Sequence, residues 1–285
     1  MQRSDFRFLE RLRVRWAEID AQQIVFNGHY LTYFDTGVAG YWRALALPYA
    51  ATMASFDGDL FVRKATLEYL GSARYDDVLE IGMQCTRVGS SSITFSGGAF
   101  RQDQLLVSCE LVYVFADPVA KVARPVPVEL RALFVDFEAG QTMVEVRVGS
   151  WDELEGAARP IRSDVFIGEQ QIPADMEWDE ADADAVHAVA FNRLGRALGT
   201  GRMLEHVPGV AKIGRMAVAA TFRNGGVGRA VLDVLLDAAR ARGDREAVLH
   251  AQITAVRFYE RAGFVRRGSV FDEAGIAHVE MLRVL

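Results

Sequence analysis

The stretch Arg223-Asn224-Gly225-Gly226-Val227-Gly228-Arg229 decides how the second half of this chain folds. It joins an apolar run, Ile213 to Ala219, to a run of helical period, Ala230 to Arg240. A glycine-rich turn from a strand into a helix leaves backbone N–H groups without partners, and the helix dipole adds partial positive charge there. Such a turn is typical of a pyrophosphate site, so we expect this half to bind a phosphorylated cofactor.

These residues alone are also compatible with two roles that do not involve phosphate binding. Arg223 stands at the loop entrance, where a guanidinium can hold a phosphate through two hydrogen bonds, but a surface Arg is often only solvated. The glycines can form a tight turn that binds nothing. The stretch is not a full Gly-x-Gly-x-x-Gly, and no acidic residue is placed to fit a Rossmann site.

Composition limits the classes of function. The 285 residues are enough for two domains, and 51% of them are hydrophobic and 25% charged, as in globular proteins. The net charge is −6 and no segment is dominated by Lys and Arg, which argues against a nucleic-acid partner. No apolar run reaches the roughly 20 residues of a membrane span, and the N-terminus lacks a signal core, so we expect a cytoplasmic protein that does not enter a membrane.

Cysteine and histidine usage predicts neither disulfides nor a metal. Cys85 and Cys109 lie in apolar, strand-like runs and are expected to be reduced core residues. The five histidines are scattered without metal-ligand spacing, so no metal is expected.

The first half predicts one long helix followed by strands. Apolar residues from Leu31 to Leu45 recur at helical spacing, with Asn27-Gly28 as a capped start and Pro48 as the stop. One helix followed by consecutive strands favours an antiparallel sheet around a central helix. The strand-like runs are 61–69, 78–88, 92–100 and 105–115.

A boundary near Asp136 to Gln141 divides the chain into expected domains 1–138 and 139–285. The second domain alternates strands and helices, with an acidic loop at Asp175 to Asp184, which favours a mixed sheet and an α+β class for the whole chain. Its expected strands are 143–148, 187–192, 196–204, 213–219, 247–251 and a C-terminal hairpin; its helices are 151–158, 161–166, one from Gly228, and 255–261.

The second domain resembles the GNAT N-acetyltransferases. Arg-x-x-Gly-x-Gly at 223–228 is similar to their acetyl-CoA loop, and Ala255-Val256-Arg257-Phe258-Tyr259-Glu260-Arg261-Ala262-Gly263-Phe264 is similar to their second motif. Gly275-Ile276-Ala277-His278-Val279-Glu280-Met281, with Gly168 to Pro173 upstream, resembles the ElaA branch. The resemblance implies a mixed sheet splayed near its middle, with acetyl-CoA in the gap. The cofactor-binding residues that it implies are Met216, Ala217, Val218, Arg223, Asn224, Gly225, Gly226, Val227, Gly228, Arg229, Ala255 and Phe258.

By the same resemblance Tyr259 is the general acid that protonates the departing CoA thiolate, and an amine is the acceptor. Gln252 stands where the family usually has Asn. Candidate bases are Glu169, Glu177 and His250; for each, a solvated or structural role stays open. The acidic run 177–184 is either an attractor for a cationic amine or a solvated loop.

The first domain resembles hotdog-fold acyl-CoA thioesterases of the 4-hydroxybenzoyl-CoA/YbgC type over roughly residues 7–131. The residues that carry this resemblance are Arg13 to Leu31, Phe61 to Leu70 and Ala73 to Ile81. It implies that Asp20 attacks the thioester or activates water, while Asn27 and Tyr30 orient the substrate. N–H groups near Gly28 and His29 would stabilise the oxyanion. No Gly-x-Ser-x-Gly elbow exists, which argues against a serine triad.

The chain departs from the YbgC-type pattern at three places: Phe26 replaces a Tyr, Asn27 a frequent His, and Gln22-Gln23 a small pair. Hotdog domains of this type associate, so the resemblance implies a homodimer or homotetramer. The expected protein is a bifunctional enzyme that uses acyl-CoA and acetyl-CoA. Two alternatives remain: one domain is a non-catalytic acyl-CoA sensor, or the hotdog domain is an oligomerisation scaffold for the transferase.

Overall fold

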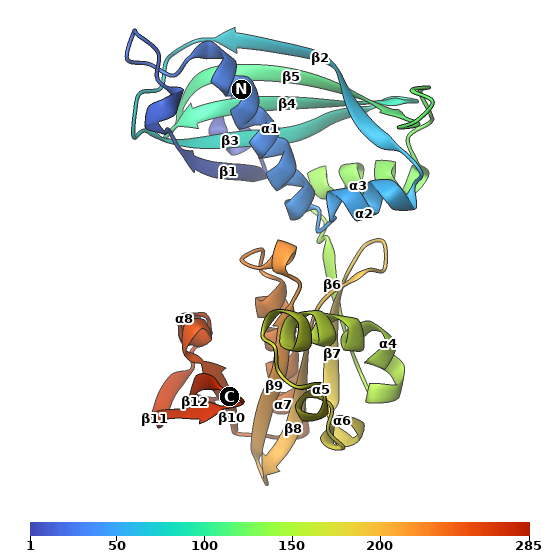
Figure 1. The fold of residues 1–285 in the computed structure, drawn as a ribbon, viewed down its shortest axis with the longest axis vertical. Coiled ribbons are helices and arrows are strands. Elements are labelled where there is room, and N and C mark those ends of the chain that lie inside the picture. The colour runs from blue at the N-terminus through green and yellow to red at the C-terminus, as the bar shows by residue number, and fades with distance from the viewer. The chain divides into compact units, whose positions relative to one another are not determined.

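The computed structural model describes residues 1–285, and the chain divides into two compact units, Met1–Met143 and Val144–Leu285. Each unit is built on its own sheet, of five strands in the first and seven in the second (Figure 1). The domain boundary expected after residue 138 falls at the last residue of α3 (Val128–Glu138). The expected α+β class, with an antiparallel sheet in the first unit and a mixed one in the second, is confirmed.

The first unit is an antiparallel sheet with a long helix on it. The strand order is β1-β3-β4-β5-β2. Its elements are η1 (Arg3–Asp5), β1 (Phe8–Arg13), η2 (Trp16–Glu18), α1 (Asn27–Ala44), α2 (Tyr49–Ser55), β2 (Asp59–Tyr69), β3 (Val78–Val88), β4 (Ser92–Arg101), β5 (Gln104–Ala116) and α3.

Helix α1 provides much of this unit's core. Phe34 and Tyr41 are fully buried, and the ring of Tyr41 meets the ring of Phe95 on β4 with centroids 5.4 Å apart. Gly37 allows the helix to approach the sheet closely, because a Cβ there would lie 2.9 Å from Ile81 Cγ2. The helix begins at Asn27 as expected, but the N-cap position is Phe26 and no side chain caps the helix.

Both cysteines are free and buried in this unit, as expected from their apolar surroundings. Burial raises the pKa of the Cys85 thiol and of the Cys109 thiol to about 12, so neither is a thiolate near neutrality. Neither unit has a helix whose length and apolar character would let it cross a membrane.

The second unit is a mixed sheet in the order β11-β12-β10-β9-β8-β7-β6. Its strands are β6 (Val144–Gly149), β7 (Val186–Asn192), β8 (Ala197–Val207), β9 (Val210–Val218), β10 (Glu246–Gln252), β11 (Val265–Glu273) and β12 (Ile276–Val284). Its helices are α4 (Trp151–Arg162), η3 (Ser163–Glu169), α5 (Ala174–Glu177), α6 (Ala181–Asp184), η4 (Ala220–Phe222), α7 (Val227–Arg242), η5 (Ile253–Ala255) and α8 (Val256–Arg261).

The sheet splays between β9 and β10. These two strands are parallel and pair only where Val210–Lys212 faces Glu246–Val248, whereas every other neighbouring pair is antiparallel and longer. Beyond Lys212 one edge of β9 has no strand partner, and β10, β11 and β12 turn away from it (Figure 1). Unpaired backbone N–H and C=O groups of β9 therefore border the opening, as the resemblance implied.

A β-bulge on β9 strengthens this divergence. Arg215 and Met216 lie opposite the single residue Gly201, and Arg215 has a φ of 51°. A bulge bends its strand and re-aims the side chain at the extra residue. The guanidinium of Arg215 is thereby directed at the acidic segment that contains α5 and α6.

Candidate functional sites

The glycine loop forms the start of helix α7. Gly226 has a φ of 87°, a left-handed conformation that a side chain would strain, and it is the N-cap residue. The first helical bond runs from the Ala230 N–H to the Gly226 carbonyl at 2.9 Å, which leaves the preceding N–H groups of the first turn without helical acceptors. The loop therefore has the donors and the dipole that bind a pyrophosphate.

These donors border a cavity of about 660 Å³, which we name the loop cavity. Predicted residues that line it are Met216, Val218, Arg223, Asn224, Gly226, Gly228, Arg229, Ala255, Phe258 and Tyr259. Three other predicted residues do not line it: Ala217 and Val227 are buried in the core, and Gly225 is exposed outside the cavity lining. Thr254 and Arg261 also line the cavity, and sequence reasoning did not single them out.

The loop arginines have protein partners. Arg223 donates from Nη2 to Glu169 Oε2 at 2.6 Å and from Nε to the Val218 carbonyl at 3.0 Å. Arg229 pairs with Asp233 one turn along α7 at 2.7 Å. All four side chains of these two ion pairs are nearly half exposed, so a phosphate can replace a carboxylate at little cost. The same geometry ties Glu169, one candidate base, to Arg223.

A second cavity of about 400 Å³ is lined from both sides of the splay, by β8, β9 and the segment 166–179 on one side and by β10 and β12 on the other, and we name it the inner cavity. It shares five lining residues with the loop cavity: Gln170, Met216, Gln252, Ala255 and Tyr259. The two cavities therefore meet where β9 and β10 separate. A thioester entering from one cavity can be reached there by an acceptor in the other.

Tyr259 stands at this meeting point. Its side chain is 8% exposed, and burial raises the pKa of its hydroxyl, with no hydrogen bond contributing. The hydroxyl therefore holds its proton through neutral and moderately alkaline pH. A neutral, unpartnered hydroxyl beside both cavities has the chemistry of a proton donor.

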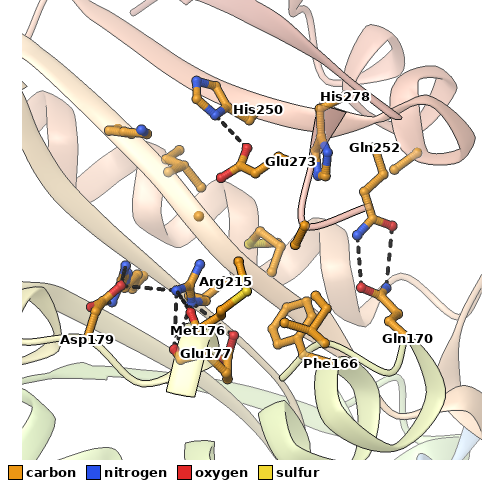
Figure 2. Close-up of a pocket in the computed structure, with 18 of the residues that line it drawn as sticks. Phe166, Gln170, Met176, Glu177, Asp179, Arg215, His250, Gln252, Glu273 and His278 are labelled. Carbon is orange, nitrogen blue, oxygen red and sulfur yellow. Dashed lines mark hydrogen bonds and ion pairs between the residues drawn. The ribbon is translucent and has the colours of Figure 1, made fainter. Parts of the chain in front are cut away.

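Gln170 and Gln252 face each other across the same junction (Figure 2). Gln252 Nε2 donates to Gln170 Oε1 at 2.9 Å, and Gln170 Nε2 donates to Gln252 Oε1 at 3.4 Å. Each amide donates one hydrogen bond to the other and accepts one, which links β10 to the segment after η3. The sequence did not indicate this partner for Gln252.

The inner cavity contains a histidine–glutamate pair. His250 on β10 lies with Nδ1 2.9 Å from Glu273 Oε2, at the end of β11 (Figure 2). A carboxylate oxygen accepts this hydrogen bond, so the neutral imidazole tautomer that forms it has its proton on Nδ1 and its lone pair on Nε2. The edge of the Phe271 ring packs against the imidazole, with centroids 4.9 Å apart. Of the candidate bases, Glu177 and His250 line this cavity, and Glu273 and Phe271 fix the ring of His250.

The acidic run 177–184 is neither a solvated loop nor a free cation attractor, which corrects both expectations. It extends from the last residue of the short helix α5 through the short helix α6, and Glu177 and Asp182 are almost fully buried. Arg162 donates to Glu177 at 2.5 Å and to Asp182 at 2.8 Å. Three arginines neutralise three acids in this cluster: Arg162, Arg202 and Arg215 with Glu177, Asp179 and Asp182.

The pKa shifts in this cluster follow from burial and pairing. Burial raises the pKa of Glu177 and outweighs its hydrogen bond from Arg162. Burial also acts on Asp182, but hydrogen bonds from Arg162 and Arg202 overcome it and lower that pKa. The hydrogen bond from Arg202 lowers the pKa of Asp179. Glu177, the third candidate base, is committed to this cluster.

Asp20 opens a tight turn in the first unit. A bridge between Ile19 and Val25 closes the turn, and Asp20 Oδ1 accepts the Gln22 N–H at 2.8 Å. Gln23 adopts a φ of 61° within this turn, a conformation that favours glycine. This explains why the thioesterase pattern that the domain resembles has a pair of small residues where this chain has Gln22-Gln23. The carboxylate is half-buried, and its second oxygen has no protein partner.

The first turn of α1 supplies fewer donors than expected. The His29 N–H is taken by the Phe26 carbonyl at 2.9 Å, whereas the N–H groups of Asn27 and Gly28 have no protein acceptor. Tyr30 is 2% exposed, and its hydroxyl accepts the Ala73 N–H at 2.9 Å, so it anchors the loop before β3. The exposed Asn27 side chain is the better placed of the two predicted orienting residues.

Sequence reasoning missed Glu18, a buried carboxylate two residues before Asp20. Its side chain is 3% exposed, accepts the Tyr33 hydroxyl at 2.6 Å and pairs with Arg15. Burial opposes ionisation, but these hydrogen bonds outweigh it and lower the pKa of Glu18. Glu18 therefore fixes the segment that carries Asp20 against α1.

Two family models match the chain. The acetyltransferase (GNAT) domain matches residues 155–285, and the thioesterase superfamily matches residues 22–108. The uncharacterized N-acetyltransferase YjcF of Bacillus subtilis is 34% identical over 124 residues, which cover 43% of this chain and 87% of that protein. A putative esterase of Aquifex aeolicus is 31% identical over 96 residues, which cover 34% of this chain and 74% of that protein.

A third relative is the acyl-CoA thioester hydrolase YbgC of Escherichia coli. It is 29% identical over 124 residues, which cover 43% of this chain and 92% of that protein. The pairing of a hotdog thioesterase domain with a GNAT domain, expected from the sequence motifs, is confirmed.

Proposed function

Because the chain belongs to the thioesterase superfamily through its first unit and to the acetyltransferase (GNAT) family through its second, we propose that it is a bifunctional acyl-CoA enzyme. The first unit hydrolyses acyl-CoA thioesters, and the second transfers the acetyl group of acetyl-CoA to an amine. The observation that carries the proposal is the junction at Tyr259, where the loop cavity and the inner cavity meet in the splay between β9 and β10.

In the second unit, the free N–H groups of the α7 turn and the side chains of Arg223 and Arg229 hold the pyrophosphate. The open edge of β9 near Met216 and Val218 pairs with the amides of the pantetheine arm. The thioester then lies at the junction of the cavities. Tyr259 gives its proton to the sulfur as the carbon–sulfur bond breaks, and the amine nitrogen forms the new bond to carbon.

In the first unit, Asp20 acts on the thioester carbonyl as a nucleophile or through a water molecule. Its second carboxylate oxygen has no protein partner, which supports either role. The N–H groups of Asn27 and Gly28, at the positive end of α1, stabilise the oxyanion, and the Asn27 side chain orients the substrate.

The unit functions in this proposal as a homodimer or homotetramer. Trp16 and Phe26 flank the Asp20 turn in the chain, and both are more than half exposed. Tyr75, also more than half exposed, packs edge-on against Trp16 with centroids 5.2 Å apart. Large exposed aromatic side chains gathered near one turn favour an interface that covers this turn.

The test is a series of acyl-CoAs with increasing chain length, assayed on the full chain with and without amines. We expect free acid and thiol without any amine, and an N-acyl product only when an amine is present. Binding of acyl-CoA without either product would favour the sensor alternative. N-acyl product without hydrolysis of any member would favour the scaffold alternative for the first unit.

A further inference from the structure

We propose that the inner cavity binds an acceptor that carries both an amine and a carboxylate, as a free amino acid does. His250 accepts the proton of the amine, Glu273 positions His250, and Lys212 binds the carboxylate. This inference rests on the acetyl transfer proposed above and adds the base and the class of the acceptor.

The register of the sheet places these groups on one face. Lys212 faces Val248 across the only parallel pairing, so its side chain and that of His250, two residues farther along β10, lie on the same side. Both line the inner cavity, and so does Glu273. The cavity volume of about 400 Å³ suits a small acceptor and not a folded protein.

Lys212 is the cation of this cavity that lacks a counter-ion. Arg202 and Arg215 also line it, but each is held by carboxylates of the buried cluster at 2.5 to 3.1 Å. Lys212 is half-buried, and no carboxylate of the chain lies within ion-pair distance of its ammonium. A partly desolvated ammonium without a partner favours an anionic group on the ligand.

His250 and His278 both line this cavity with Nε2 unpaired, and His250 is the one whose ring is oriented by a carboxylate. Its Nδ1–H is committed to Glu273, so Nε2 is the accepting nitrogen. The charged and titratable groups around His250 are Glu273 on β11, Lys212 on β9, and His278 and Glu280 on β12. Glu280 lies opposite His250 in the pairing of β10 with β12, and it forms an ion pair with Arg267. His278 donates from Nδ1 to the Ile276 carbonyl at 2.8 Å, which fixes its ring apart from the His250–Glu273 pair.

The acceptor enters as an ammonium and gives one proton to His250 Nε2, which leaves a neutral amine. The nitrogen attacks the thioester carbon, the carbon–nitrogen bond forms, and the carbon–sulfur bond breaks. The second proton of the nitrogen passes in net to the sulfur by way of Tyr259. The products are the N-acetyl acceptor, the CoA thiol, and one proton that His250 releases to water.

The test compares free amino acids with their own carboxamides as acceptors for acetyl-CoA on the full chain. Detecting the N-acetyl product by mass spectrometry excludes thiol released by hydrolysis in the first unit. We expect the best amino acid to exceed its carboxamide by at least about tenfold in kcat/KM, the effect of one charge-assisted contact. Equal use of both forms, or no transfer to any amino acid, overturns the inference.

The variant Lys212→Met should remove this preference by raising KM for the amino acid while kcat is retained. Lys212→Arg, which keeps the charge, should retain most of the preference. It provides a second test if the methionine variant folds poorly. The matched control is Lys121→Met, at an exposed position in the first unit, which should leave the preference unchanged. Persistence of the preference in Lys212→Met contradicts the role of this residue.

Hydroxylamine tests the base, because it is largely unprotonated at neutral pH and does not need one. His250→Gln and Glu273→Gln should lower transfer to the amino acid by about 10²-fold or more, yet change transfer to hydroxylamine much less. Equal losses with both acceptors would mean a merely structural role. If no N-acetyl product forms with any amine and acetyl-CoA does not bind, the proposed transferase itself fails. Transfer to amines without these preferences refutes the further inference alone.

Discussion

Gln170 and Gln252 exchange two amide hydrogen bonds, of 2.9 and 3.4 Å, at the line where the loop cavity and the inner cavity meet (Figure 2). Both residues line both cavities. Met216, Ala255 and Tyr259 line both cavities as well, so the amide pair belongs to the boundary between them.

Replacing Gln252 by Leu should leave the Gln170 amide without a partner in a partly buried place. We expect a loss of about 1 kcal/mol in the free energy of unfolding of the second unit and a higher KM for the acceptor. Urea unfolding and steady-state kinetics measure the two effects. The double variant with Gln170→Leu should recover the lost stability, since both polar partners are then absent. No recovery would mean that the pair is not the reason for the loss.

Gly226→Ala should weaken the binding of acetyl-CoA. Its φ of 87° costs a residue with a side chain roughly 1 kcal/mol or more, and relief of this strain would move the N–H groups of the first turn of α7. The matched control is Gly156→Ala on α4, where a new Cβ meets nothing within 4 Å, and which should be neutral or stabilise by about 0.5–1 kcal/mol. Calorimetric titration with acetyl-CoA decides between a binding role and none.

Arg162→Met should destabilise the second unit strongly, by about 3–5 kcal/mol, because it leaves Glu177 and Asp182 buried with one fewer cation. The exposed pair of Arg159 with Glu155 provides the control, and Glu155→Gln should cost less than about 0.5 kcal/mol. Trp151 and Trp178 lie over the Arg162 guanidinium, so their fluorescence should follow the unfolding. Similar losses in both variants would contradict this account of the cluster.

Stability of the second unit should fall in acid. The pKa values of Asp179 and Asp182 are lowered in the folded protein, so their contribution is complete above the ordinary carboxyl range near about 4 and is lost as the pH falls through the folded values. Glu177 acts in the opposite direction, because burial raises its pKa. Urea titrations between pH 3 and 7, in about five steps, measure the net effect. A urea midpoint that stays constant or rises as the pH falls would be inconsistent with the expected loss of stability.

Asp20→Asn and Tyr259→Phe should separate the two activities. We expect Asp20→Asn to lower thioester hydrolysis without altering the N-acetyl product, and Tyr259→Phe to lower acetyl transfer by about 10²–10⁴-fold without altering hydrolysis. Because burial raises the pKa of Tyr259, its proton is retained at moderately alkaline pH, and the transfer rate should not decline there through its ionisation. A loss of both activities in either variant would argue for one shared site.

The sequence predicted the elements whose signals are local. The glycine loop, the helix after it and the motif around Tyr259 each depend on a few neighbouring residues, and the structure has α7 and α8 where these signals lie. The long helix of the first unit was equally readable, because its apolar face repeats from Leu31 to Leu45. These signals need no knowledge of the tertiary fold.

The sequence did not indicate contacts between distant segments. From the sequence, Glu177 and Asp182 were compatible with a solvated loop, because no neighbouring residue indicates their partners. Arg202 on β8 pairs with Asp182, and Arg215 on β9 pairs with Glu177. His250 and Glu273 are 23 residues apart and meet only because β12 lies between β10 and β11. The order of the strands in the sheet determines which distant residues meet, and this order cannot be predicted directly from a single sequence.

The central claim is that one chain holds two separate acyl-CoA sites, and the stoichiometry of binding tests it most directly. Calorimetry would use a ketone analogue of acetyl-CoA that cannot be cleaved at sulfur. We predict two molecules bound per chain, and only one in Gly228→Val, where a Cβ alone would already lie 3.3 Å from Val218 Cγ2. A single molecule per chain in the unaltered protein, or none, would contradict the account.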